Sequence, residues 1–121
     1  METRISFGKR SSIELVVAGK TIAQSRQAII LEEQGYQPVL YVPIRDINSS
    51  YLKSSEQSSH CPYKGDANYW HVQVKDQLLE NVAWEYKEPY KEVNRIKDHI
   101  AFYLTKIDDV YINDIKINSE H

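Results

Sequence analysis

The ten-residue stretch from Cys61 to Trp70 reads CPYKGDANYW and holds the only cysteine of the chain and one of its two tryptophans. Pro62 restricts one backbone angle and Gly65 permits a positive φ, which together predict a tight turn leading into a strand. Lys64 is expected at the exposed tip of this turn. An ammonium group beside aromatic faces can bind an anion or form a cation–π contact. The stretch is therefore the first candidate for a functional site.

Each of these residues also has a structural interpretation. Pro62 and Gly65 are ordinary turn residues, and a lone cysteine is most often a small buried apolar side chain. Trp70 and Trp84 are most simply a cross-strand pair in a core. For Lys64 the sequence leaves the structural and the functional interpretation open.

Three kinds of catalytic chemistry can be considered. Cys61 could be a nucleophile if Lys64 favours its thiolate, but the adjacent strand residue His60 is expected to point to the opposite face. A mixed metal site would need His60, Cys61, His71 and His99, whose spacing matches no strong zinc signature. Magnesium-dependent nucleotidyl transfer typically uses Asp-x-Asp and a glycine-rich loop, and the sequence has neither. We therefore expect neither a metal nor a cofactor.

Composition limits the class of protein. The chain has 121 residues, is 41% hydrophobic and has a net charge of −2, which is typical of one soluble domain. It lacks the basic face that nucleic acids and anionic membrane surfaces require, and no apolar stretch is long enough to span a membrane. A single cysteine cannot form an internal disulfide, so the cytoplasm is the expected compartment. The sequence leaves the oligomeric state open.

Most of the chain alternates between apolar and polar residues, as half-buried β-strands do. Strands are expected at 13–17, 21–23, 28–31, 38–42, 69–74, 82–86, 100–104, 110–112 and 115–117. Short helical turns are expected at 44–52 and 90–97, and the serine-rich segment 54–59 is expected to be a loop. The predicted fold is a compact, mainly antiparallel β domain over residues 13–117, either a barrel or a folded-over sheet, with an extension at 1–12 and a tail at 118–121.

The order of four segments resembles the domain of unknown function 427 family, which some collections label nucleotidyltransferase-like. These segments are SRQAIILEEQGYQPVLYVPIRDI, SSHCPYKGDANYW, VAWEYKEP and IKDHIAFY. The resemblance covers roughly residues 13–103 and implies an Mss4-like β-tent fold, whereas the family has no settled activity. The positions that match the family pattern include Arg26, Glu33, Tyr41, Pro43, Asp46, Cys61, Lys64, Gly65, Ala67, Tyr69, Trp70, Trp84, Tyr86 and Pro89.

The preferred hypothesis is a pocket at the Cys-Pro-x-Lys-Gly loop for a small anionic or aromatic ligand. In it, Arg26 and Lys64 would bind the anion, and aromatic side chains would form an apolar wall. The residues assigned to this pocket are Arg26, Glu33, Tyr41, Asp46, Cys61, Lys64, Tyr69, Trp70 and Trp84.

Two alternatives remain. An enzyme could use the same pocket, with Lys64 or Cys61 as the reactive group and Glu33 or Asp46 as acid or base. A protein-interaction module could instead present its sheet edge to a partner. Glu85, on the face opposite Trp84, is expected to be solvated.

Overall fold

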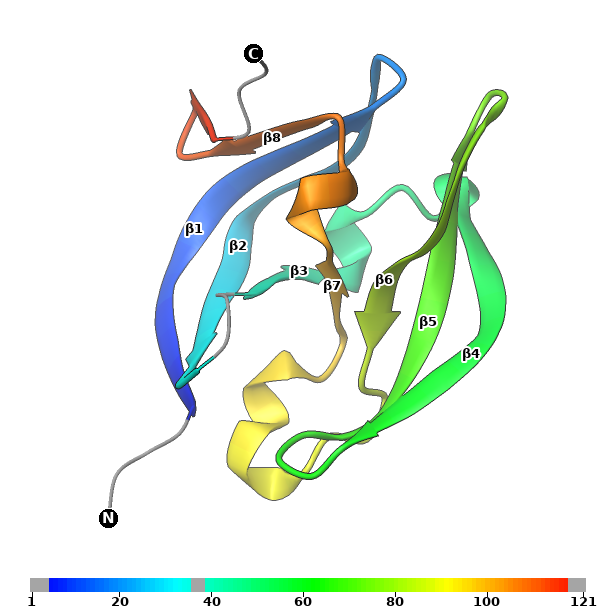
Figure 1. The fold of residues 1–121 in the computed structure, drawn as a ribbon. Helices are drawn as coiled ribbons and strands as arrows, with labels where there is room; N and C mark the ends of the chain where they lie inside the picture. The colour runs from blue at the N-terminus through cyan, green and yellow to red at the C-terminus, as the bar shows by residue number, and fades with distance from the viewer. Residues whose placement is uncertain (1–4, 36–38, 118–121) are drawn as a thin grey trace.

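The computed structural model describes residues 5–35 and 39–117, which form nine strands and four 3-10 turns (Figure 1). The strands are β1 (Ile5–Val17), β2 (Lys20–Glu33), β3 (Val39–Pro43), β4 (Leu52–Cys61), β5 (Gly65–Val74), β6 (Gln77–Glu85), β7 (His99–Phe102), β8 (Asp109–Ile112) and β9 (Ile115–Lys116). The turns are η1 (Ile44–Asp46), η2 (Ser49–Tyr51), η3 (Lys91–Ile96) and η4 (Leu104–Lys106). None of the helical segments in these residues is long and apolar enough to cross a membrane.

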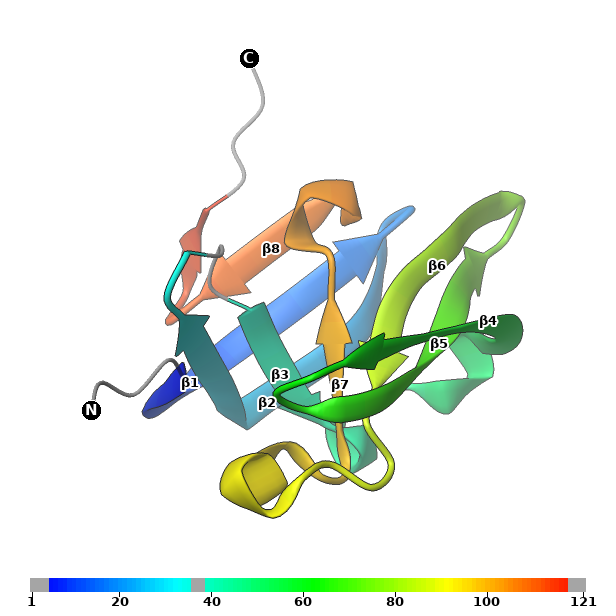
Figure 2. The same cartoon turned by 60° about the horizontal axis from the view of Figure 1, so that its bottom comes forward.

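All nine strands belong to one sheet, in the order β4-β5-β6-β7-β3-β2-β1-β8-β9. Every pairing between these strands is antiparallel, as the alternating sequence predicts. Strands β4 and β9 lie at the two ends of this order, so the sheet is open and the barrel alternative is not observed. Two arms, β1–β2–β8 and β4–β5–β6, face one another and are joined through β3 and β7 (Figure 2).

The first hairpin is longer than predicted. Ala18 and Gly19 have φ values of 50° and 77°, the left-handed conformation that two-residue hairpin turns require. The segments 21–23 and 28–31, expected to be separate strands, both lie within β2. β1 begins at Ile5. Residues 5–12, which were expected to belong to an N-terminal extension, therefore lie in a strand that pairs with β2.

The serine-rich segment 54–59 is a second difference. It was expected to be a loop, but it lies within β4 and pairs with β5 on both sides of a bulge between Ser54 and Ser58. Most side chains of this edge strand are exposed, so no alternation of apolar and polar residues marks it in the sequence. The helical turns expected at 44–52 and 90–97 are confirmed as η1, η2 and η3.

The sheet carries a core on each face of its central strands. In β3, Leu40 and Val42 belong to the first core and Tyr41 to the second, because successive strand residues point to opposite faces. The first core lies between the two arms and includes side chains of β1, β2, β5, β6 and β8. The second core, with η3 packed on it, consists of Ile29, Leu31, Tyr41, Ala67, Trp84, Tyr86, Val93, Ile96 and Ala101.

Candidate functional site

The Cys-Pro-x-Lys-Gly loop is a tight turn that packs against the segment 88–90. The Lys64 backbone N–H donates to the Cys61 carbonyl at 3.3 Å, and the Tyr90 N–H donates to the Lys64 carbonyl at 3.0 Å. Gly65 has φ +117°, and a Cβ atom at this position would lie 3.4 Å from the Glu88 carbonyl oxygen. The predicted turn and the positive φ of Gly65 are therefore confirmed.

The expectation that Lys64 is exposed is wrong. Its side chain is 8% exposed, and Nζ lies 3.7 Å from Cys61 Sγ, to which it donates a hydrogen bond. The physical reason is tertiary: residues 88–90 pack against Lys64 and Gly65, whereas Pro62 and Tyr63 are the exposed residues of the turn. The Cys61 side chain is partly buried against the second core, which places the Lys64–Cys61 pair at the margin of this core.

Three aromatic side chains from different elements meet at the second core, and we call Tyr69, Trp84 and Tyr103 the aromatic group. The ring centroids of Trp84 and Tyr103 are 4.4 Å apart, and those of Tyr69 and Trp84 are 6.3 Å apart. Trp84 is 8% exposed and Tyr103 is 40% exposed, so Tyr103 offers a ring to solvent while Trp84 supports it from below. Tyr41 belongs to the same core but is 1% exposed and cannot contact a ligand directly.

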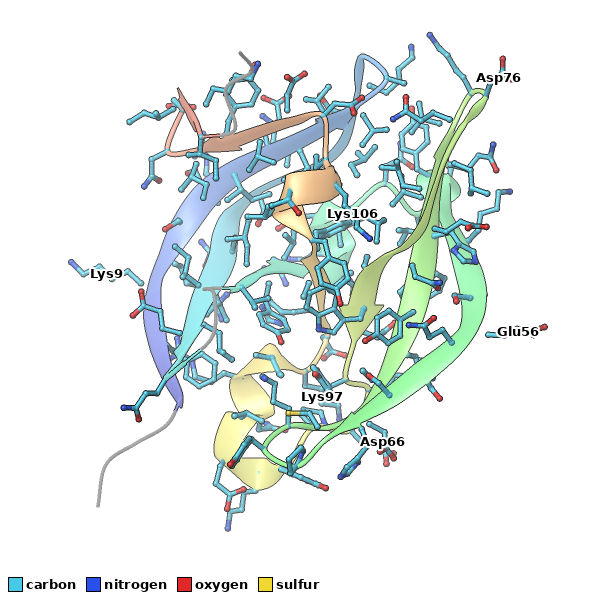
Figure 3. All side chains as sticks on the ribbon, viewed as in Figure 1. Lys9, Glu56, Asp66, Asp76, Lys97 and Lys106 are labelled. Carbon is cyan, nitrogen blue, oxygen red and sulfur yellow. The ribbon has the colours of Figure 1, made fainter. Side chains whose placement is uncertain are left out.

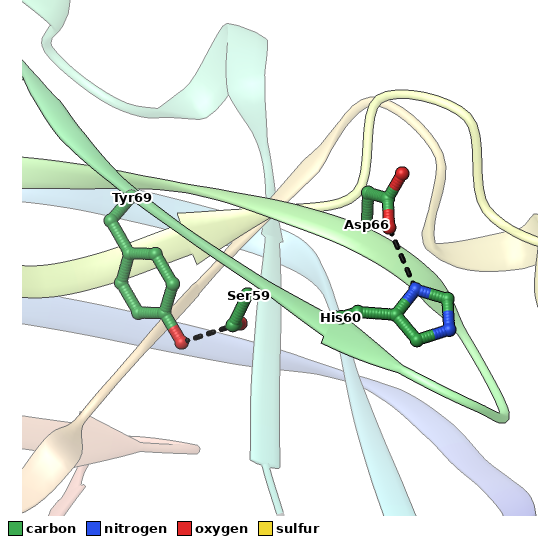
Figure 4. Close-up of polar contacts among 4 residues, drawn as sticks. All are labelled: Ser59, His60, Asp66 and Tyr69. Atoms are coloured by element: carbon green, nitrogen blue, oxygen red, sulfur yellow. Dashed lines mark hydrogen bonds and ion pairs between the residues drawn. The ribbon is translucent and has the colours of Figure 1, made fainter.

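Polar groups border the aromatic group. The Tyr69 hydroxyl is hydrogen-bonded to Ser59 Oγ at 3.0 Å (Figure 4), and the Tyr69 phenol also interacts with Tyr103. Burial, and then the Tyr69 phenol, raises the pKa of Tyr103, which therefore remains a protonated donor at neutral pH. Lys106 Nζ lies 5.2 Å from the Tyr103 ring centroid, and Figure 3 shows Lys106 between the two arms of the sheet.

Tyr103 and Lys106 were not among the predicted site residues. The signal for Tyr103 was present, because it lies two positions after Ala101 and alternation places both on the face of the second core. No signal marked Lys106, which reaches the site only because η4 follows β7 where a strand was expected to continue to residue 104.

Trp70 does not join the aromatic group. It packs against the first core, and its Nε1–H donates to Glu85 Oε1 at 2.8 Å. Glu85 is 6% exposed, so the expectation that it is solvated is wrong. Asn68 pairs with Glu85 across β5 and β6, which makes Trp70 the diagonal neighbour that covers this carboxylate.

Arg26 and Asp46 lie elsewhere again, in a groove of about 820 Å³ on the β1–β2–β8 arm. It is lined by residues 12–14 of β1, residues 24–27 of β2, Arg45, Asp46, Tyr111 and Asp114. None of the residues of the Cys-Pro-x-Lys-Gly loop lines this groove.

Glu33 is the last residue of β2, and its side chain lies outside the described part of the structure. Of the predicted site residues, the structure thus groups Tyr41, Cys61, Lys64, Tyr69 and Trp84 and separates Arg26, Asp46 and Trp70 from them.

Among the described residues, the three histidines form no cluster with Cys61. His60 Nδ1 is hydrogen-bonded to Asp66 Oδ1 at 2.7 Å on the exposed face of β4 (Figure 4), and His71 Nδ1 accepts from the Asn81 N–H. Within residues 5–35 and 39–117, no three His, Cys, Asp or Glu side chains are arranged to hold a metal ion. The histidines considered for a mixed metal site are therefore not brought together.

His99 is buried, and we expect it to make stability depend on pH. Its Nδ1–H donates to the Lys97 carbonyl at 2.8 Å, and Nε2 has no hydrogen-bond partner among the described residues. Burial lowers the pKa of His99 below its usual 6.5 and outweighs the Lys97 bond, which raises it. Arg10 and Arg45 also lower this pKa, and Asp98 raises it.

Above pH 6.5 the ring is neutral in both states, so His99 contributes no pH dependence. As the pH falls below 6.5, the unfolded chain binds a proton that the folded chain does not. The free energy of unfolding then decreases, by at most about 1.4 kcal/mol per pH unit. Urea unfolding at several pH values should show a shallower slope for His99→Gln, and equal slopes for the two proteins would contradict the prediction.

Comparison with known proteins matches most of the chain to one family. The family model described as "Domain of unknown function (DUF427)" matches residues 8–113 of the 121. No curated protein matches the chain significantly.

Proposed function

Because the chain belongs to the domain of unknown function 427 family, whose description names no activity, we propose from its geometry that it binds a small ligand. The ligand carries an aromatic ring and an anionic group. It occupies the surface formed by the aromatic group and Lys106, on the second core against which Cys61 also packs.

One observation carries this proposal: Trp84 and Tyr103 are 4.4 Å apart while Tyr103 remains 40% exposed. A ring supported from below by a second ring is held in place, and an offset aromatic contact on its open side contributes about 0.5–1.5 kcal/mol. Lys106 offers an exposed ammonium near the same ring, and the phenols of Tyr69 and Tyr103 offer hydrogen bonds. An aromatic anion satisfies all of these groups at once.

We expect a thermal-shift screen of aromatic carboxylates and aromatic phosphates to find a ligand whose affinity depends on Tyr103 and Lys106. Lys106→Met should weaken binding of the best compound by roughly tenfold, the usual effect of losing one charge-assisted contact of about 1.5 kcal/mol. Tyr103→Ala should weaken it at least as much because the stacking surface is lost. Titrations followed by tryptophan fluorescence would measure both effects.

Lys9→Met is the matched control, because Lys9 is an exposed lysine of β1 that points away from the molecule (Figure 3). It should bind the compound as the wild type does. A compound that binds Tyr103→Ala with unchanged affinity would place the ligand site elsewhere and contradict the proposal.

An enzyme that uses the Lys64–Cys61 pair is the second candidate function. The 3.7 Å distance between Nζ and Sγ supports it, because an amine and a thiol at one site can serve as nucleophile and proton donor. The same screen separates the two functions. Mass spectrometry would find the bound compound chemically unchanged in a binding protein and converted or covalently attached in an enzyme.

The proposal also includes the type of fold and the location in the cell. The Mss4-like β-tent architecture implied by the resemblance is supported by an antiparallel sheet whose two arms face one another. A cytoplasmic location is supported by the single cysteine of the chain.

A further inference from the structure

We propose that the groove on the β1–β2–β8 arm is a second binding site, for a zwitterionic ligand about as long as a tripeptide. The ligand's carboxylate would lie at one end, near Arg26 and Arg45, and its ammonium at the other end, near Tyr111 and Asp114. None of the residues that line this groove belongs to the aromatic group, so this site is independent of the function proposed above.

A bulge in β2 presents Arg26 to the groove. Ser11 pairs with Ala28, but Ile13 pairs with Ser25, so two residues of β2 lie opposite one residue of β1. These two residues, Arg26 and Gln27, are therefore both exposed although they are consecutive in a strand. Without the bulge, alternation would turn one of the two inward.

A buried serine holds the bulge in place. Ser25 is 5% exposed, and its Oγ accepts from the Gln27 backbone N–H at 2.9 Å and donates to Asp46 Oδ2 at 2.6 Å. This contact ties β2 to η1, which carries Arg45 on the same groove. The two arginines are thus positioned by a shared hydrogen-bonded support rather than by chance proximity on a surface.

The arginine end of the groove has a net positive charge. Arg26 and Arg45 make no ion pair with any of the residues that the structure describes, and they outnumber the single carboxylate beside them, Asp46. A guanidinium group presents its N–H donors in a planar fork that matches a carboxylate. This end is therefore suited to a carboxylate.

The opposite end, on β8 and the turn after it, carries a carboxylate and a phenol. Asp114 follows in the turn after β8, and Tyr111 lies in β8. Glu14 lies on β1 between the two ends, and its carboxylate accepts a hydrogen bond of 2.7 Å from the Thr21 hydroxyl of β2. The Asp114 carboxylate and the Tyr111 hydroxyl suit an ammonium group.

Sheet topology separates the two ends. η1 lies on the β3 side of β2, as the bridge between Ala23 and Ile47 shows, whereas β1 and β8 lie on the other side. From β2 to β8 is two strand spacings, or about 10 Å. A tripeptide spans about the same length, at roughly 3.3–3.6 Å per residue. The groove volume of about 820 Å³ is within the range of small-molecule sites.

The test uses three probes: triglycine, N-acetyl-triglycine and triglycine amide. Titrated at millimolar concentration and followed by the backbone amide signals of the intact protein, triglycine should shift the signals of the groove residues. Each capped peptide should bind at least about tenfold more weakly, because one charge is missing.

Two substitutions test which end of the groove binds the carboxylate and which binds the ammonium group. Arg26→Gln should remove the preference for triglycine over its amide, and Asp114→Asn should remove the preference for triglycine over its acetylated form. Arg95→Gln, at an exposed arginine that lies over the Phe7 ring, should change neither preference. The proposal is overturned if triglycine shifts no groove signal, if the capped peptides bind as tightly as triglycine, or if both preferences survive the substitutions.

Discussion

Replacing Gly65 with alanine is expected to lower the free energy of unfolding by about 2–3 kcal/mol. Two effects combine at this position. The φ of +117° is a conformation that residues with a Cβ atom rarely adopt, and the added Cβ would lie 3.4 Å from the Glu88 carbonyl oxygen. Since Glu88 belongs to the segment that covers Lys64, relief of this contact would loosen the loop from residues 88–90.

Two other glycines separate these effects. Gly19 has φ +77° but open space around it, so Gly19→Ala measures the backbone strain alone. Gly8 has no positive φ but a Cβ there would lie 3.4 Å from the Ile30 carbonyl, so Gly8→Ala measures the contact alone. Each should cost less than Gly65→Ala in chemical denaturation. If the Gly65→Ala and Gly19→Ala proteins were equally stable, the loop would have moved away from the Glu88 carbonyl without a loss of stability, which would contradict the prediction.

The same loop shows how far the sequence alone could lead. The turn and the positive φ of Gly65 followed from residue types, because proline and glycine restrict or free the backbone locally. The burial of Lys64 did not, because it depends on a segment more than twenty positions away that packs against the turn. The residue types that form a turn can be recognised in the sequence, whereas the distant segment that packs against the turn cannot.

The structure separates some of the predicted site residues for a related reason. Arg26 was assigned to the loop pocket as a cation that would bind an anion together with Lys64. The segments 21–23 and 28–31 form one strand with a bulge, and the bulge directs Arg26 into the groove beside Asp46 instead. The sequence also suggested Trp70 as the cross-strand partner of Trp84, but Tyr69 is the residue that shares a face with Trp84, because these two are directly paired in β5 and β6.

The second large effect is expected at Trp70. Trp70→Phe should lower the free energy of unfolding by about 2–3 kcal/mol, because it removes the N–H that donates to Glu85 at 2.8 Å. Glu85 is 6% exposed, so its carboxylate would lose this donor without gaining full access to water. Chemical denaturation at neutral pH would measure the change.

Trp84→Phe is the matched control. It removes an indole that is more buried than that of Trp70, but the Trp84 N–H forms no hydrogen bond with the described residues, so only packing is lost. It should therefore cost less than Trp70→Phe.

Substitutions of Glu85 complete the test by a double-mutant cycle. Glu85→Gln keeps an oxygen that accepts the indole N–H and should be nearly neutral. In the Glu85→Leu background, Trp70→Phe should cost no more than the packing loss measured at Trp84, because no buried carboxylate is then left without its donor. If Trp70→Phe costs as much with leucine at position 85 as with glutamate, the hydrogen bond contributes nothing. The burial of Glu85 would then stabilise the sheet by some other contact.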